Sequence, residues 1–119
     1  MHKAERIERM NALRDALMIA KAEVYKLRDT EDDGTCNFDS PAINLDKMKE
    51  IYGLTKKSVE EAIQSAGLRC FEWTAWKEHY LIISGLTRGQ ANCRTVMAER
   101  AEQVLRAAGY PTTMYYQMD

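Results

Sequence analysis

An apolar stripe with helical periodicity near the start of the chain constrains the fold more than any other feature. Its residues recur three or four positions apart: Ile7, Met10, Leu13, Leu17, Ala20, Val24 and Leu27. This spacing gathers them on one face of a helix, which we expect to end near Asp29. From Met10 the spacing also fits the a and d positions of a heptad. The stripe can therefore pack on its own domain or on a second copy of the chain in a homodimer.

After this helix, the residue pattern predicts an alternation of strands and helices. Turn-forming residues dominate 30–41 and indicate a connector. A polar pair, Lys77 and Glu78, joins two segments rich in aromatic and branched residues, which is typical of a β-hairpin. In that hairpin we expect Phe71 and Trp73 to share the buried face. The expected elements are a strand at 42–45, a helical region at 47–66 interrupted at Gly53, strands at 70–76 and 79–84, a helix at 92–108 and a strand at 112–118.

The order of these elements indicates the fold class. Strand, helix, strand, strand, helix, strand is the split β-α-β pattern of ferredoxin-like domains, with a four-stranded antiparallel sheet and two helices on one face. A chain of 119 residues has room for one hydrophobic core. The sequence therefore predicts a single α+β domain over 1–119. A long N-terminal helix at 1–29, the candidate dimerisation element, precedes an α+β core at 35–119.

A winged-helix fold is the alternative. Residues 47–66 place Gly53 at the turn of a helix-turn-helix, and the hairpin that follows resembles a wing. A DNA-binding protein of this kind would depend on Lys56 and Lys57. Against it, Lys49 stands where the motif needs a small buried residue, and two glutamates would lie near the DNA backbone.

The balance of charge bears on the partner. Seventeen Lys and Arg residues stand against eighteen Asp and Glu residues, so the net charge is −1. This charge gives no global attraction to nucleic acid or to an anionic membrane, and only a local patch could bind either one. No apolar run approaches the roughly 20 residues that cross a bilayer. We therefore expect no membrane partner, and nucleic acid stays open as a partner.

The three cysteines, Cys36, Cys70 and Cys93, are odd in number and lack a C-x-x-C spacing. The chain also lacks a signal-peptide pattern, so we expect reduced thiols and a cytoplasmic location. Cys93 near a predicted helix start, with His79 or His2 as its base, is the one candidate for nucleophilic catalysis. A packed cysteine is the commoner role for this residue type. Because no paired general acid and base can be identified, we expect the protein not to be an enzyme.

Potential metal ligands show no useful pattern. The histidines and cysteines are scattered singly, and the acidic run at 31–33 does not match a calcium-binding loop. The sequence therefore predicts neither a metal site nor a cofactor.

A glycine-containing loop that leads into a helix is the strongest candidate ligand site. It spans 87–95, and its glycine leaves backbone N–H groups accessible beside the positive end of the helix dipole. Its two arginines could pair with an anion, and its amide side chains could form directional hydrogen bonds. The candidate ligand-binding residues are Arg88, Gly89, Gln90, Asn92, Arg94 and Thr95. Structural capping of the helix is the alternative role of these residues.

Aromatic residues cluster on the predicted strands. They are Trp73, Trp76, Tyr80, Tyr115 and Tyr116. An aromatic sheet face can stack RNA bases, but no combined aromatic and basic signature accompanies these residues. We therefore expect them to pack in the core.

Three stretches of the chain resemble small uncharacterised proteins carried by phages and mobile elements of gut Firmicutes. The stretches are GTCNFD at 34–39, GQAN at 89–92 and YYQMD at 115–119. Those proteins often have Gly followed by Asn-Arg-Arg where this chain has Ala91 followed by Asn92, Cys93 and Arg94. The resemblance implies an accessory protein that counters host defence, by occluding a nuclease or by sequestering a nucleotide signal, and it implies no activity.

These observations together favour a non-enzymatic accessory protein that holds a phosphate-bearing nucleotide or a protein ligand at the 87–95 loop. A second hypothesis is a protein inhibitor that acts through the basic side of the N-terminal helix or through the acidic loop at 31–46. A winged-helix DNA-binding protein is the third.

Overall fold

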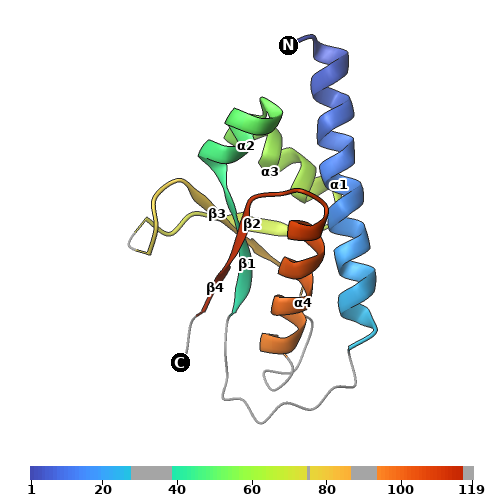
Figure 1. Cartoon of the computed structure of the whole chain (residues 1–119), viewed down its shortest axis with the longest axis vertical. Helices are drawn as coiled ribbons and strands as arrows, with labels where there is room; N and C mark the ends of the chain where they lie inside the picture. The colour runs from blue at the N-terminus through green and yellow to red at the C-terminus, as the bar shows by residue number, and fades with distance from the viewer. Residues whose placement is uncertain (28–38, 75, 87–93, 117–119) are drawn as a thin grey trace.

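The computed structural model describes residues 1–27, 39–74, 76–86 and 94–116, without the side chains of Arg94 and Thr95. It shows an α+β protein with a long N-terminal helix and one four-stranded antiparallel sheet (Figure 1). The elements are α1 (Lys3–Tyr25), β1 (Ser40–Asn44), α2 (Leu45–Tyr52), α3 (Lys56–Ser65), β2 (Arg69–Phe71), β3 (Tyr80–Ser84), α4 (Arg94–Ala107) and β4 (Thr112–Tyr115).

The sheet has the strand order β2-β3-β1-β4, and every neighbouring pair is antiparallel. Ala42 of β1 lies opposite Ile82 of β3 on one side and opposite Thr113 of β4 on the other. Phe71 of β2 lies opposite the same Ile82. Since directly paired residues point to the same face of a sheet, these four side chains form one row across it.

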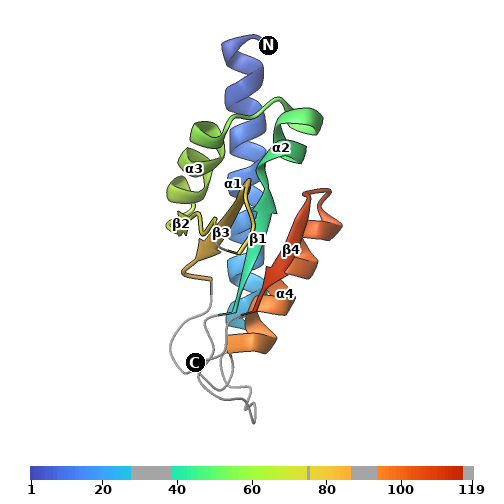
Figure 2. The ribbon, with the colours of Figure 1, turned by 90° about the vertical axis from the view of Figure 1, so that its left-hand side faces the viewer.

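Three helices lie on one side of the sheet. α4 packs on β1 and β4, α3 packs on β2, and α1 packs along both helices. Figure 2 shows α1 passing behind the sheet, with α3 and α4 on either side of it. The main core lies between these helices and the inward side chains of the central strands, which include Ile43, Leu81 and Ile83.

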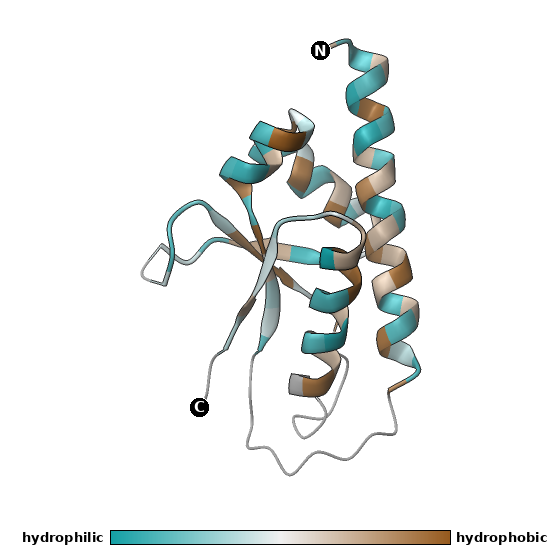
Figure 3. Cartoon of the chain, viewed as in Figure 1, coloured by the Kyte–Doolittle hydropathy of each residue, from teal (hydrophilic) through white to brown (hydrophobic). Residues whose placement is uncertain are grey.

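The apolar stripe of α1 is buried within its own chain. Leu13, Leu17, Ala20 and Val24 are buried in the main core, with Met10 and Leu27 packed against it. Ile7 is exposed, and the helix ends at Tyr25 rather than near Asp29. Figure 3 shows brown and teal segments alternating along α1, as an amphipathic helix requires. Because the stripe is already covered, a homodimer would need another surface, and dimerisation stays a prediction.

Gly53 divides the second helical region into α2 and α3, as its position predicts. Its φ of 67° is the left-handed conformation that ends a helix at little cost for glycine. The side chain of Asn44 accepts a hydrogen bond from the N–H of Lys47 at the start of α2. Thr55 accepts one from the N–H of Ser58 at the start of α3.

Two cations of α1 bind the carbonyl ends of these short helices. Arg9 Nη1 donates to the carbonyl of Tyr52 at 2.7 Å, and Lys21 Nζ donates to the carbonyl of Ala66 at 2.9 Å. Both carbonyls lie at the negative end of a helix dipole, so each contact joins a hydrogen bond to a favourable charge interaction. α1 therefore fixes α2 and α3 by polar contacts as well as by apolar packing.

The contact of Lys21 can be tested by substitution. We expect Lys21→Met to lower the free energy of unfolding by about 1 kcal/mol, because it removes a charge-assisted hydrogen bond from a helix C-terminus. Lys26 is the matched control, since it is exposed at the end of α1 and its partner is Glu23, three residues earlier in the chain, and Lys26→Met should cost less than about 0.5 kcal/mol. Urea unfolding of the two variants compares them. Equal losses would show that the contact with Ala66 contributes nothing of its own.

The predicted hairpin differs most from the structure. β2 ends at Phe71, and β3 begins at Tyr80, so the connection is much longer than the pair Lys77 and Glu78. The prediction that Phe71 and Trp73 share the buried face was wrong, since 47% of Phe71 and 43% of Trp73 is exposed. The main core lies on the other face of the sheet, and the chain leaves the sheet after Phe71.

The remaining boundaries differ by a few residues. The first strand runs from Ser40 to Asn44 instead of 42–45, and the last strand ends at Tyr115 instead of 118. The described part of α4 begins at Arg94, and the expected start at 92 lies outside the described residues. Among the described residues, no helix combines the length and the apolar character needed to cross a membrane.

Candidate functional site

Most of the predicted ligand site lies outside the described residues. This applies to Arg88, Gly89, Gln90 and Asn92, and also to Cys36 and Cys93. Arg94 and Thr95 form the beginning of α4, but their side chains are not described. The proposed role of this helix start therefore stays a prediction, and the described residues offer three cavities to compare with it.

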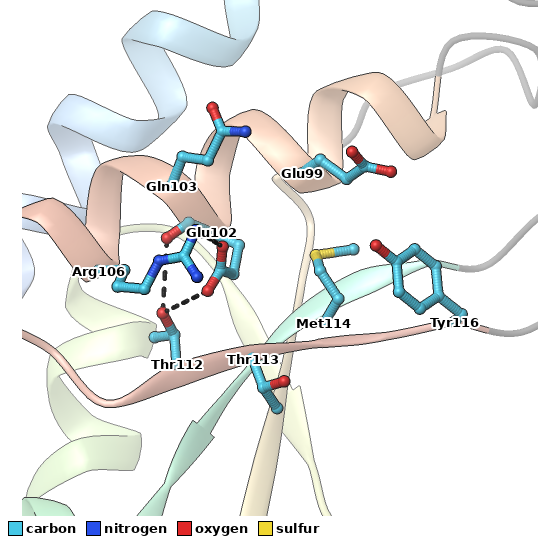
Figure 4. A pocket seen from close by; sticks show the side chains of 8 residues that line it. All are labelled: Glu99, Glu102, Gln103, Arg106, Thr112, Thr113, Met114 and Tyr116. Atoms are coloured by element: carbon cyan, nitrogen blue, oxygen red, sulfur yellow. Dashed lines mark hydrogen bonds and ion pairs between the residues drawn. The ribbon is translucent and has the colours of Figure 1, made fainter.

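The first cavity lies between α4 and β4 and has a volume of about 320 Å³ (Figure 4). Its central group is the buried carboxylate of Glu102, whose Oε1 accepts from the Thr112 hydroxyl at 3.2 Å and whose Oε2 pairs with Arg106 Nη2 at 3.3 Å. Glu99 and Tyr116 lie at the other end of the cavity in Figure 4. Burial raises the pKa of the Tyr116 hydroxyl, and its hydrogen bond with Glu99 adds to this.

The polar groups at the centre of this cavity are thus engaged with one another. Both oxygens of the Glu102 carboxylate have partners, and the Tyr116 hydroxyl is bound to Glu99. A ligand would have to displace these contacts to gain its own. These contacts hold β4 against α4. This structural role explains the presence of the polar residues without a ligand.

The second cavity is apolar and lies at the C-terminal end of α1. It has a volume of about 530 Å³ and is lined by residues that include Val24, Tyr25, Leu86 and Met97. Residues 28–38 and 87–93 follow its lining residues in sequence and lie outside the described part of the chain. No function is assigned to this cavity.

The third cavity lies between the first turns of α1 and the start of α3, and its volume is about 340 Å³. We call it the α1–α3 cavity. Its lining residues are Lys3, Arg6, Ile7 and Met10 from α1 and Thr55, Lys57, Ser58 and Glu61 from the α3 side. Three of these eight side chains are cationic and one is anionic, so the lining carries a net positive charge.

The cations of the α1–α3 cavity are available to a ligand. Within the part of the chain that the structure describes, Lys3, Arg6 and Lys57 form no ion pair. All three are exposed. Charged side chains that lack a partner and share a cavity repel one another, and an anion between them relieves that repulsion.

The start of α3 adds polar groups to the same cavity. Thr55 caps the helix, and its hydroxyl donates to the buried hydroxyl of Ser58 at 3.2 Å. The N–H groups of Lys56 and Lys57 lie in the first turn, where a helix offers no internal acceptor. The positive end of the α3 dipole therefore borders the cavity that the three cations line.

The two neighbouring lysines of α3 have different surroundings. Lys57 lines the cavity, whereas Lys56 forms an ion pair with Glu72 after β2. Its hydrogen bond to Glu72 raises the pKa of Lys56, against a smaller effect of desolvation. Of the two lysines that the winged-helix hypothesis needs, only Lys57 is therefore without an ion pair in the described structure.

Sequence reasoning named the parts of this cavity but did not bring them together. It noted the basic side of the N-terminal helix and it noted Lys57, each for a separate hypothesis. Their proximity depends on how α1 crosses α3, and no local pattern encodes that crossing. The available signal was Thr55, a helix-capping residue directly before Lys56 and Lys57.

Catalytic and metal-binding groups are sparse in the described structure. No group of three or more His, Cys, Asp or Glu residues suited to hold a metal occurs among the described residues. Burial raises the pKa of the Cys70 thiol, and the nearby Glu60 raises it further, while Lys56 opposes them. Cys70 is thus kept in its neutral, poorly nucleophilic form.

Comparisons of the chain with family models, with curated proteins and with solved structures found no match.

Proposed function

We propose that the protein is a non-enzymatic binding protein that holds a phosphate-bearing ligand in the α1–α3 cavity. The observation that carries this proposal is the convergence of Lys3, Arg6 and Lys57, without ion pairs in the described structure, on the N-terminus of α3. A phosphate group carries close to two negative charges at neutral pH and presents several acceptor oxygens. It therefore matches both the charge and the donors of the cavity.

The size of the α1–α3 cavity supports a small ligand. Its volume of about 340 Å³ lies at the lower end of the roughly 300–1,000 Å³ that ligand pockets occupy. Ile7 and Met10 supply apolar contact beside the cations. A nucleotide carries a phosphate, which suits the cations, and a flat base, which suits the apolar side chains. The cavity is therefore consistent with the nucleotide ligand that we expect from the sequence.

The wider setting of the proposal comes from the resemblance to phage and mobile-element proteins. A cytoplasmic accessory protein that sequesters a nucleotide signal could counter a host defence by binding alone. We also propose that the fold is ferredoxin-like. Its support is the central position of β1 and β3 in the order β2-β3-β1-β4, with α3 and α4 on one face.

The alternative functions stay predictions. The outward face of α1 exposes Met18, Ile19 and Tyr25, as a surface for a protein partner would. Half of the acidic loop, 31–38, lies outside the described residues. The winged-helix hypothesis loses support, because β2 and β3 are part of one four-stranded sheet rather than a separate wing.

Titration calorimetry with inorganic phosphate and then with AMP and ATP tests the proposal. We expect saturable binding that weakens at least tenfold in Arg6→Ala and in Lys57→Ala, because each variant removes a cation from the cavity. Lys47→Ala is the matched control. It makes the same change in net charge on α2, where Lys47 pairs with the exposed Glu50. Unchanged affinity in both cavity variants would place the phosphate elsewhere, and absence of binding by every probe would overturn the proposal.

A further inference from the structure

The connection between β2 and β3 carries two tryptophans across the face of the sheet that the helices leave uncovered. A turn in which the N–H groups of Trp76 and Lys77 donate to the carbonyl of Trp73, at 3.0 and 3.2 Å, holds both rings in place. Both tryptophans contact Tyr115 of β4 edge to face, with centroid distances of 5.8 Å for Trp73 and 4.8 Å for Trp76. Trp76 also contacts Tyr80 at 5.8 Å. We call these rings and Phe71 the aromatic surface.

The inner part of the aromatic surface is a small second core. Ala42, Ile82 and Tyr115 are buried there, with Trp76 and Tyr80 packed against them. Burial also raises the pKa of the Tyr115 hydroxyl. This core explains Tyr115, Trp76 and Tyr80 through packing, as we expected from the sequence. The same expectation was wrong for Trp73 and Tyr116, which are 43% and 58% exposed. The second core does not explain the outer rings.

Phe71 and Trp73 are the outer rings, and nearly half of each is exposed. Phe71 lies on the same face as the buried Ile82, since the two are direct partners across β2 and β3. Trp73 is held from below by Tyr115. Two large rings thus keep an exposed side while their inner sides are fixed, which is the arrangement a stacking platform requires.

Cations without acidic partners border these rings. Arg69 is two residues from Phe71 on β2 and therefore points to the same face. Lys77 Nζ lies 5.4 Å from the centroid of Trp76 and 5.3 Å from that of Tyr80. Neither Arg69 nor Lys77 forms an ion pair within the described residues, and Glu72, the acid between the rings, is neutralised by Lys56. The surface thus combines exposed aromatic rings with available positive charge.

We propose that the aromatic surface binds single-stranded nucleic acid, with bases stacked on Trp73 and Phe71 and phosphates beside Arg69 and Lys77. Unpaired bases have accessible faces that stack on aromatic rings, whereas the bases of a duplex are already stacked on one another. The charge of the flanking side chains selects this occupant over an apolar protein segment, which would gain nothing from two cations. This surface is separate from the α1–α3 cavity, and the inference does not rest on the function proposed there.

Fluorescence anisotropy of the full chain with labelled twelve-nucleotide oligo(dT) and oligo(U), at 50 mM salt, tests the inference. We expect binding that quenches tryptophan fluorescence and weakens at least tenfold in Trp73→Ala. Trp73→Phe should retain most of the affinity, because it keeps an aromatic ring. Arg69→Ala and Lys77→Ala should weaken binding and each reduce the salt dependence.

The controls separate this surface from the rest of the molecule. Tyr116→Ala removes an exposed aromatic ring that lines the α4–β4 cavity instead, and it should bind the oligonucleotide like the unmodified chain. Lys47→Ala removes one positive charge on α2, outside both the aromatic surface and the α1–α3 cavity, and should also leave oligonucleotide binding unchanged. Thermal unfolding confirms that each variant is folded. No binding at 50 mM salt, equal binding by Trp73→Ala, or equal affinity for duplex DNA would overturn the inference.

Discussion

Leu17→Ala is expected to lower the free energy of unfolding by about 3 kcal/mol, because it leaves a cavity in the main core where the leucine is now fully buried. Leu17 has an exposed fraction of 0%, and its side chain extends from α1 into the main core. Truncation of the side chain loses the free energy gained by moving its apolar atoms from water into the core. It also leaves the neighbouring side chains without their packing contacts. So large a change is a substantial part of the stability of a small domain.

The adjacent residue supplies the control for this experiment. Met18 is 52% exposed, outside the buried stripe of α1, so Met18→Ala should change the free energy of unfolding by less than about 0.5 kcal/mol. Guanidinium unfolding of both variants, at two protein concentrations, gives the comparison. If the stripe packed on a second copy instead, the unfolding midpoint would rise with protein concentration. That result would contradict the intramolecular packing of α1.

Tyr115→Ala is expected to cost about 3 to 4 kcal/mol, because it empties the second core on the other face of the sheet. Tyr115 is only 2% exposed and contacts the rings of Trp73 and Trp76. Its removal should also release the two tryptophans into water. Their emission should therefore shift to longer wavelength before the rest of the domain unfolds.

The neighbouring tyrosine again serves as the matched control. Tyr116 is 58% exposed, so Tyr116→Ala should leave the tryptophan emission unchanged and cost less than about 1 kcal/mol. Chemical unfolding followed by circular dichroism and by tryptophan fluorescence measures both effects. Equal losses of stability in the two variants would show that the rings on this face do not form a core.

Regular patterns made the helices predictable from the sequence. The spacing of Leu13, Leu17 and Val24 recurs with the helical period, so burial on one face follows from local chemistry. Gly53 marks the break between α2 and α3 because its left-handed conformation is costly for other residues. The order of the four strands along the chain was also predicted, although their ends were not.

The hairpin was mispredicted because two different environments favour the same residues. Aromatic and branched side chains between 70 and 76 suit a strand, but they suit equally a connection that folds back over a sheet. Tyr115, about forty positions away, is the residue that contacts both Trp73 and Trp76. A local window does not contain that partner.

The α1–α3 cavity could not be predicted for the same physical reason. Arg6 and Lys57 are far apart in the sequence, and each alone looks like a solvated surface charge. The predicted loop at 87–95 drew attention because its glycine and arginines are adjacent. Sequence reasoning therefore favours sites built from neighbours over sites built by tertiary packing.

The position of α1 against α4 has a consequence for how the protein is made. The ribosome synthesises α1 well before α4, yet α4 is a main cover of its apolar stripe. β1 likewise pairs with β3 and β4, which both emerge later. Leu13, Leu17 and Val24 thus have only part of their native cover, the part from α3, until residues up to 107 have left the exit tunnel. Folding must then wait for nearly the whole chain, and the early helix is the segment that a chaperone would protect in the meantime.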